Sequence, residues 1–228
     1  MSGLPRPCLC LVTNRRLVAP DARTPDASLL ALERFLDEAL AADLDLIQIR
    51  ERDVEARRLA GLVSRTMIRR GGRPVRVLVN DRADVAVAGG ADGVHLRGDG
   101  PPVAKVRALG PESWIVGRSV HSVEEARVHG AADYLLFGTV FAGGSKEQPG
   151  SIQGLDALAG AVAATAAPVL AIGGVTAERA PSVMASGAAG AAAIGVFLPE
   201  GRAPSAEGPV RAAAALRAAL LRSRIRPC

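Results

Sequence analysis

The sequence predicts a (β/α)₈ barrel, and three features of the chain support this fold class. Eight short apolar runs alternate with stretches that have helical spacing. The runs are too continuous for half-exposed antiparallel strands and are typical of parallel strands buried on both faces. A Gly-Ala pair stands between a helical stretch and the next apolar run at Gly90, Gly130 and Gly187, as repeated helix–strand units require. The length of 228 residues fits one such barrel.

Each apolar run is expected to form one strand: Cys8–Thr13, Leu44–Ile49, Val75–Asn80, Gly93–Leu96, Trp114–Gly117, Tyr134–Phe137, Val169–Ile172 and Ala191–Ile194. Helices are expected between most of them, for example at Leu29–Ala42, Val54–Arg70, Val123–Gly130 and Leu155–Ala166. We expect a single domain over residues 1–228, with the core at about 8–200 and a C-terminal helix and basic tail at 205–228. No G-x-G-x-x-G motif follows the first run, which disfavours an open dinucleotide-binding sheet.

Composition narrows the classes of partner. Hydrophobic residues make up 49% of the chain and aromatic residues only 3%, so the core must consist of Ala, Val, Leu and Ile. A net charge of +5 suits phosphorylated small molecules, whereas one Trp and one Tyr provide no base-stacking platform, so we expect no nucleic acid partner. Two uncharged stretches, 157–177 and 180–199, are interrupted by Gly and Pro and are not expected to enter a membrane. Three cysteines without framework spacing indicate a cytoplasmic protein.

Polar residues follow the second and third runs, where the active site of such a barrel lies. Alternation places Gln48, Arg50 and Arg52 on one side of the chain. Two guanidinium groups and an amide suit a phosphate or carboxylate ligand. The third run ends at Asn80 and Asp81, and the carboxylate of Asp81 is a candidate ligand for Mg²⁺ or a partner for the neighbouring arginine.

Small residues follow the last two runs. Gly173 and Gly174 come after the seventh run, and Ile194 and Gly195 come at the end of the eighth. Turns of this kind let backbone N–H groups approach a phosphate, with a helix N-terminus behind it. A Gly-Gly pair alone is equally consistent with an ordinary tight turn, but its position in the barrel favours phosphate binding.

Two histidines lie at run ends. His121 follows the fifth run beside Ser119 and is the stronger candidate for a general acid or base, because an ordinary histidine titrates near neutral pH. For His95, at the end of the fourth run, a core role is at least as consistent as catalysis. Ser122 precedes two glutamates and is expected to cap a helix rather than act as a nucleophile.

Taken in order, the run-end motifs resemble the thiamine phosphate synthase/TenI superfamily over about residues 8–197. The motifs are Gln48-Ile-Arg-Glu-Arg52, Asn80-Asp-Arg82, Gly90-Ala-Asp-Gly-Val-His-Leu96, Gly117-Arg-Ser-Val-His-Ser122, Asp133-Tyr-Leu-Leu-Phe-Gly138 and Ala171-Ile-Gly-Gly-Val175. The resemblance implies a barrel enzyme of thiamine biosynthesis, either an isomerase or a transferase.

The first reading is a TenI-like thiazole tautomerase, which aromatises carboxythiazole phosphate by proton transfer without a cofactor. This group shares the sequences at 49–52 and 117–122. The resemblance then makes His121 the acid/base group. Arg50 and Arg52 would hold the carboxylate, and the glycine turns would hold the phosphate.

The alternative is a thiamine phosphate synthase, which couples hydroxymethylpyrimidine diphosphate with thiazole phosphate, releases pyrophosphate and uses Mg²⁺. The resemblance implies diphosphate contacts at Gln48, Arg50, Asn80 and Lys146, a pyrimidine-side role for Ser119, and metal ligands at Asp81 and Asp99. Four departures count against this reading. Arg52 replaces a lysine, Gly100 replaces the metal-binding second residue of an acidic pair, and Gly195 replaces a serine. In the loop after the sixth run, Gly143 and Ser145 replace two threonines ahead of Lys146.

A third reading is a non-catalytic regulator that binds thiazole or thiamine phosphate. The sequence leaves open whether the chain forms a homodimer and whether the loop at 143–150 closes on a ligand. All three readings share a phosphorylated thiazole-type ligand, and only the synthase adds a pyrimidine diphosphate.

Overall fold

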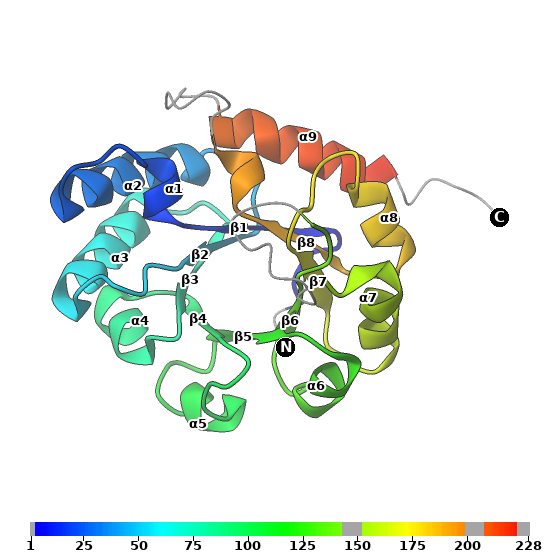
Figure 1. Cartoon of the computed structure of the whole chain (residues 1–228). Helices are drawn as coiled ribbons and strands as arrows, with labels where there is room; N and C mark the ends of the chain where they lie inside the picture. Colours follow the sequence, from blue (N-terminus) through cyan, green and yellow to red (C-terminus); the bar gives the residue numbers. More distant parts are fainter. Residues whose placement is uncertain (1–2, 143–151, 199–207, 223–228) are drawn as a thin grey trace.

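Eight parallel strands close into a barrel in chain order, and the last strand pairs with the first. The computed structural model describes residues 3–142, 152–198 and 208–222. Figure 1 looks along the barrel, with the strands at the centre and the helices around them. The strands are β1 (Cys8–Val12), β2 (Leu46–Ile49), β3 (Arg76–Asn80), β4 (Gly93–Leu96), β5 (Ile115–Val120), β6 (Tyr134–Gly138), β7 (Val169–Ile172) and β8 (Gly190–Ala193). The predicted fold class is confirmed.

Helices connect successive strands and cover the outside of the barrel (Figure 1). They are α1 (Arg15–Val18), α2 (Pro25–Leu40), α3 (Ala56–Arg70), α4 (Ala83–Gly89), α5 (Val103–Arg107), α6 (Val123–Val128), α7 (Gly154–Ala163), α8 (Ala180–Ala185) and α9 (Gly208–Arg222), with a 3₁₀ turn, η1, at Gly195–Phe197. Among the described residues no helix is both long and apolar enough to cross a bilayer.

Two boundaries differ from the prediction for identifiable reasons. β5 was expected to end at Gly117 but continues to Val120, because the buried guanidinium of Arg118 donates to the carbonyl oxygens of Gly98 and Pro101, both at 3.0 Å. A charged residue therefore lies inside the strand, where the sequence suggests a strand end. Similarly, α2 begins at Pro25 rather than at Leu29, because proline suits the first helical position.

The core has two layers. An outer layer packs strands against helices, and a smaller cluster fills the inside of the barrel. Cys8 and Cys10 both point into the inner cluster, as alternation predicts, and both are buried free thiols. The single tyrosine, Tyr134, belongs to the same cluster, and a Cβ at Gly117 would lie 2.2 Å from its ring. Gly117 thus leaves the space that this tyrosine occupies.

Candidate active site

A chain of polar side chains crosses the carboxyl ends of β2 and β3. The amide of Gln48 donates to Oδ1 of Asn80 at 2.8 Å, and the amide of Asn80 donates to Oδ2 of Asp81 at 2.8 Å. Gln48 is 2% exposed, and its Oε1 is buried with no hydrogen-bond donor in the described part of the chain. An unsatisfied buried acceptor is costly in isolation, so this oxygen is suited to receive an N–H group of a ligand.

Arg50 stands beyond Gln48 on the same side of the chain. Its guanidinium is half-buried and has no hydrogen-bond partner within the residues that the structure describes. Burial, followed by repulsion from Arg52, lowers the pKa of Arg50. Arg52 itself is exposed. A partly desolvated cation with no hydrogen-bonded partner in the described structure is suited to bind an anion, and Arg50 fits this role better than Arg52.

His95 occupies the inside of the barrel between β3 and β5. Its Nδ1 lies 2.9 Å from the hydroxyl of Tyr134, and its Nε2 lies 2.8 Å from Oγ of Ser119. Burial, with smaller effects of Arg50 and Arg118, lowers its pKa to about 3, so the ring is neutral at physiological pH. His95 is therefore a buried core residue, which is one of the two roles that the sequence allowed for it. Its contact with Tyr134 was not predicted, because that residue stands at a strand start.

The direction of these hydrogen bonds follows from the tyrosine. The buried hydroxyl of Tyr134 has His95 as its one hydrogen-bond partner in the described structure, so its proton points to Nδ1. Nε2 then carries the ring proton and donates to Ser119. The hydroxyl hydrogen of Ser119 is consequently available to an acceptor in the barrel mouth.

His121 follows β5 at the mouth and is exposed. Its Nδ1 hydrogen-bonds the carbonyl oxygen of Gly138, and its backbone N–H donates to Oε2 of Glu125 at 2.7 Å. A carbonyl oxygen only accepts, so Nδ1 carries the ring proton when the imidazole is neutral. Nε2 is then free to accept a proton from a ligand, which keeps His121 a candidate base. Ser122 caps α6 by accepting from the backbone of Glu125 at 3.1 Å, as predicted.

The predicted phosphate turns lie at the carboxyl ends of β7 and β8. Gly173 and Gly174 have φ values of +97° and +63°, and a Cβ at Gly173 would lie 2.5 Å from the Thr139 side chain. Both positions therefore require glycine. Gly195 is exposed at the start of η1, next to the half-buried Ile194.

One residue near these turns was missed. Arg179 donates to the carbonyl oxygens of Gly174 at 2.8 Å and Ala142 at 3.0 Å, and its guanidinium lies 5.0 Å from the centre of the Phe141 ring. It joins the turn after β7 to the segment after β6. Its sequence signal is weak, because a lone arginine at a helix start is ordinary surface composition.

The two candidate metal ligands differ. Asp81 has φ of +60° and accepts from the Asn80 amide and from the backbone N–H of Arg97 at 2.8 Å, so its carboxylate is held in place. Asp99 is 78% exposed and pairs with Arg97 at 2.8 Å. No three His, Cys, Asp or Glu side chains gather as metal ligands in the described ranges. One fixed carboxylate fits Mg²⁺ when substrate phosphates supply further oxygens, which is the usual protein arrangement.

The structure thus joins Gln48, Asn80 and Asp81 by hydrogen bonds and joins Ser119 to His95. Asp99 makes no hydrogen bond to these residues in the described structure and pairs with the side chain of Arg97. Lys146 and the whole loop at 143–150 lie outside the described residues.

Comparisons with known proteins converge on one family. The sequence profile of the thiamine monophosphate synthase family (TMP-TENI) matches residues 10–197. Thiamine-phosphate synthase from Methanoculleus marisnigri is 40% identical over 177 residues, covering 76% of this chain and 83% of that protein. Thiamine-phosphate synthase from Koribacter versatilis is 36% identical over 209 residues, covering 90% and 96%.

Solved structures agree. Thiamine phosphate pyrophosphorylase from Pyrococcus furiosus has a TM-score of 0.76 and 28% identity, covering 95% of this chain and 96% of its own. A 3-hexulose-6-phosphate synthase at 19% identity, with a TM-score of 0.65 and coverage of 93% and 99%, shares the fold. The names of the relatives favour the synthase alternative over the tautomerase that the sequence analysis put first.

Proposed function

Because the chain belongs to the thiamine monophosphate synthase family, we propose that it couples a hydroxymethylpyrimidine diphosphate with a thiazole phosphate and releases pyrophosphate. The observation that carries this proposal is the mouth at β2 and β3. There the half-buried guanidinium of Arg50, which has no hydrogen-bond partner among the described residues, lies near the fixed carboxylate of Asp81 and the unsatisfied acceptor of Gln48. These groups match, in turn, a diphosphate, a metal ion that Asp81 would help to hold, and a heterocycle that carries an N–H donor.

In this reaction the bond between the pyrimidine methylene carbon and the diphosphate oxygen breaks, and a bond from that carbon to the thiazole nitrogen forms. Negative charge collects on the departing pyrophosphate, so a nearby cation stabilises the transition state more than the ground state. Arg50 supplies this cation from a partly water-excluded position. Asp81 would hold Mg²⁺, which neutralises part of the diphosphate charge when bound.

The remaining residues orient the two substrates. Gln48 is better suited to an N–H donor of the pyrimidine than to a diphosphate oxygen, because its free group is an acceptor. Ser119 can donate to a ring nitrogen, since His95 already donates to its oxygen. The turns at Gly173 and at Ile194–Gly195 suit the thiazole phosphate, because their backbone N–H groups lie at strand ends.

A second candidate, thiazole tautomerisation, is favoured by His121. In the neutral imidazole, the hydrogen bond to the Gly138 carbonyl places the proton on Nδ1 and leaves Nε2 as an acceptor at the mouth, and a proton shift needs such a base. In this case Arg50 would hold the carboxylate of the thiazole.

One preparation assayed for both reactions tests the proposal. The synthase predicts thiamine phosphate from the two phosphorylated substrates with Mg²⁺, a large loss in Arg50→Gln and a much smaller effect of His121→Gln. If the protein is a tautomerase, His121→Gln should instead cause a large loss of activity on carboxythiazole phosphate. Absence of thiamine phosphate under saturating substrates and Mg²⁺, with tautomerisation present, would overturn the synthase proposal.

A further inference from the structure

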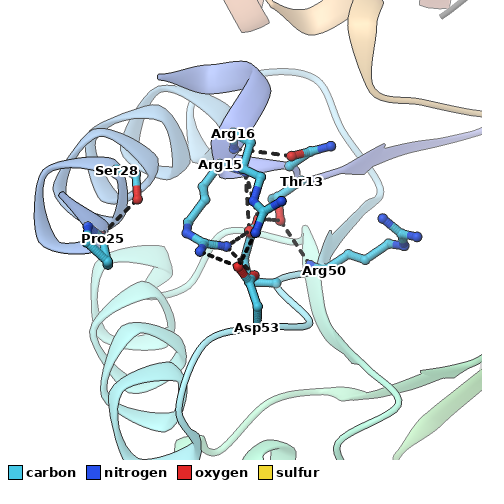
Figure 2. A network of polar contacts seen from close by, with 9 residues as sticks. Thr13, Arg15, Arg16, Pro25, Ser28, Arg50 and Asp53 are labelled. Atoms are coloured by element: carbon cyan, nitrogen blue, oxygen red, sulfur yellow. Dashed lines mark hydrogen bonds and ion pairs between the residues drawn. The ribbon is translucent and has the colours of Figure 1, made fainter. Parts of the chain in front are cut away.

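A buried polar network lies behind Arg50, on the outer side of the barrel mouth (Figure 2). Thr13 follows β1 directly and is 1% exposed. Its Oγ1 accepts from the backbone N–H of Arg50 at 2.9 Å and donates to Oε1 of Glu51 at 2.7 Å. One hydroxyl therefore joins the end of β1 to the residues that leave β2.

The direction of this link is determined by Glu51. A carboxylate only accepts hydrogen bonds, so the proton of Thr13 points to Glu51 and its lone pairs are left for the N–H of Arg50. Glu51 is 5% exposed, and burial raises its pKa. Hydrogen bonds from the backbone N–H of Arg15 at 3.0 Å and from its Nη1 at 3.2 Å favour the charged form of Glu51.

Arg15 is in turn held from the surface side. It is 7% exposed and binds both carboxylate oxygens of Asp53, at 2.5 and 2.7 Å. This bidentate pair, drawn in Figure 2, lowers the pKa of Asp53. Arg15 consequently cannot leave Glu51 without breaking several charge-assisted hydrogen bonds, and the network has one defined arrangement.

The side chain of Arg50 points the other way. Successive residues of an extended segment face opposite sides, so Glu51 faces the network while Arg50 faces the mouth. Figure 2 shows the Arg50 side chain extending away from Arg15 and Asp53. The hydrogen bond from Thr13 thus holds the main chain from which the free guanidinium projects.

We propose that Thr13, oriented by Glu51, is a positioning residue that sets the place of the Arg50 guanidinium and thereby the affinity of the mouth for a diphosphate group. The inference rests on the proposed function for the identity of the anion. It extends that function to Thr13 and Glu51, which are both buried. A small displacement of a binding group is costly, because anion binding depends on hydrogen-bond geometry.

Titration of the purified protein with inorganic pyrophosphate and Mg²⁺ by calorimetry tests the proposal without requiring turnover. Thr13→Val keeps the shape but leaves the Arg50 N–H unpaired, and we expect a Kd about tenfold higher. Thr13→Ser keeps the hydroxyl and should bind within about twofold of the wild type. In an Arg50→Gln background, Thr13→Val should cause no further loss.

Three results would overturn the proposal: an unchanged Kd in Thr13→Val, an equal loss in the Arg50→Gln background, or no pyrophosphate binding by the wild type. The first two results leave the synthase proposal intact, because that proposal is tested by the formation of thiamine phosphate. If Thr13→Val does not fold, Glu51→Gln provides the second variant. Its amide no longer forces the Thr13 proton away from Arg50, so it should also raise the Kd.

Discussion

The hydroxyl of Tyr134 lies 2.9 Å from Nδ1 of His95, inside the barrel. The two rings come from β6 and β4, and their centres are 5.5 Å apart. The tyrosine holds the buried imidazole in the tautomer that donates to Ser119. The neutral His95 thereby determines the orientation of the Ser119 hydroxyl at the barrel mouth.

The burial of His95 predicts a pH-dependent stability. Its pKa is about 3 in the folded protein, against 6.5 for an ordinary histidine. Below pH 6.5 the unfolded chain takes up a proton that the folded chain does not, so the free energy of unfolding falls as the pH is lowered toward 3. Between pH 7 and pH 5 this residue should contribute a loss of about 2 kcal/mol. Urea unfolding at both pH values measures it.

His95→Gln supplies the comparison, because it removes the titrating group but keeps hydrogen-bonding capacity. Its loss of stability between pH 7 and pH 5 should be smaller than that of the wild type by about 2 kcal/mol. Tyr134→Phe should retain the wild-type pH dependence, since the imidazole stays buried. Equal pH dependence in the wild type and His95→Gln would contradict the prediction.

Gly117→Ala tests the packing around the same tyrosine. The added Cβ would lie 2.2 Å from the Tyr134 ring, which is buried in the closed barrel and cannot move aside freely. We expect a loss of about 3 kcal/mol in the free energy of unfolding, measured by urea titration. Gly72→Ala is the matched control, because nothing lies within 4 Å of its added Cβ. A loss below about 0.5 kcal/mol in Gly117→Ala would show that the ring has room to shift.

The barrel could be predicted from the sequence because parallel strands buried on both faces leave continuous apolar runs, and glycines mark the helix ends between them. The place of Asn80, Asp81 and His121 at the mouth follows from that topology alone. The roles of these residues stay proposals, since position does not determine chemistry.

The hydrogen bonds that hold side chains and main chain in place at and below the mouth could not be predicted, because they join residues far apart in the chain. Tyr134 meets His95 across 39 positions, and Thr13 meets Glu51 across 38. Thr13 is also indistinguishable from an ordinary strand residue in the sequence. Glu51, between two arginines, has the appearance of a solvated charge, although it is buried beneath the first helix turn.

The inner thiols should be inert while the barrel is folded. Burial and the nearby Asp45 raise the pKa of Cys8 to about 12, and burial also raises that of Cys10. The reactive thiolate is therefore scarce at neutral pH, and reagent access is blocked as well. In Cys228→Ser, which leaves these two cysteines, a thiol reagent should label neither in buffer and both in urea. Rapid labelling in buffer would show that the inner cluster opens.

Arg217 predicts a stabilising contact between α9 and the amino-terminal side of the barrel. Its side chain is 13% exposed, and it donates to the carbonyl of Pro7 at 2.6 Å and to the carboxylate of Asp45 at 2.8 Å. Asp45 accepts in turn from the backbone N–H of Leu9 at 2.7 Å, so the arginine secures the start of β1 as well as α9.

Arg217→Ala should lower the free energy of unfolding by about 2 to 3 kcal/mol, because it removes the cation that pairs with the partly buried carboxylate of Asp45 and leaves the Pro7 carbonyl without its side-chain donor. Arg34→Ala, on the exposed side of α2, is the matched control and should change stability by less than about 0.5 kcal/mol. Thermal unfolding of both variants beside the wild type measures the difference. Arg217→Lys should recover part of the loss, because its ammonium group keeps a positive charge beside the carboxylate of Asp45. Equal melting temperatures for Arg217→Ala and Arg34→Ala would mean that α9 is held by its apolar face alone, through residues such as Leu216 and Leu220.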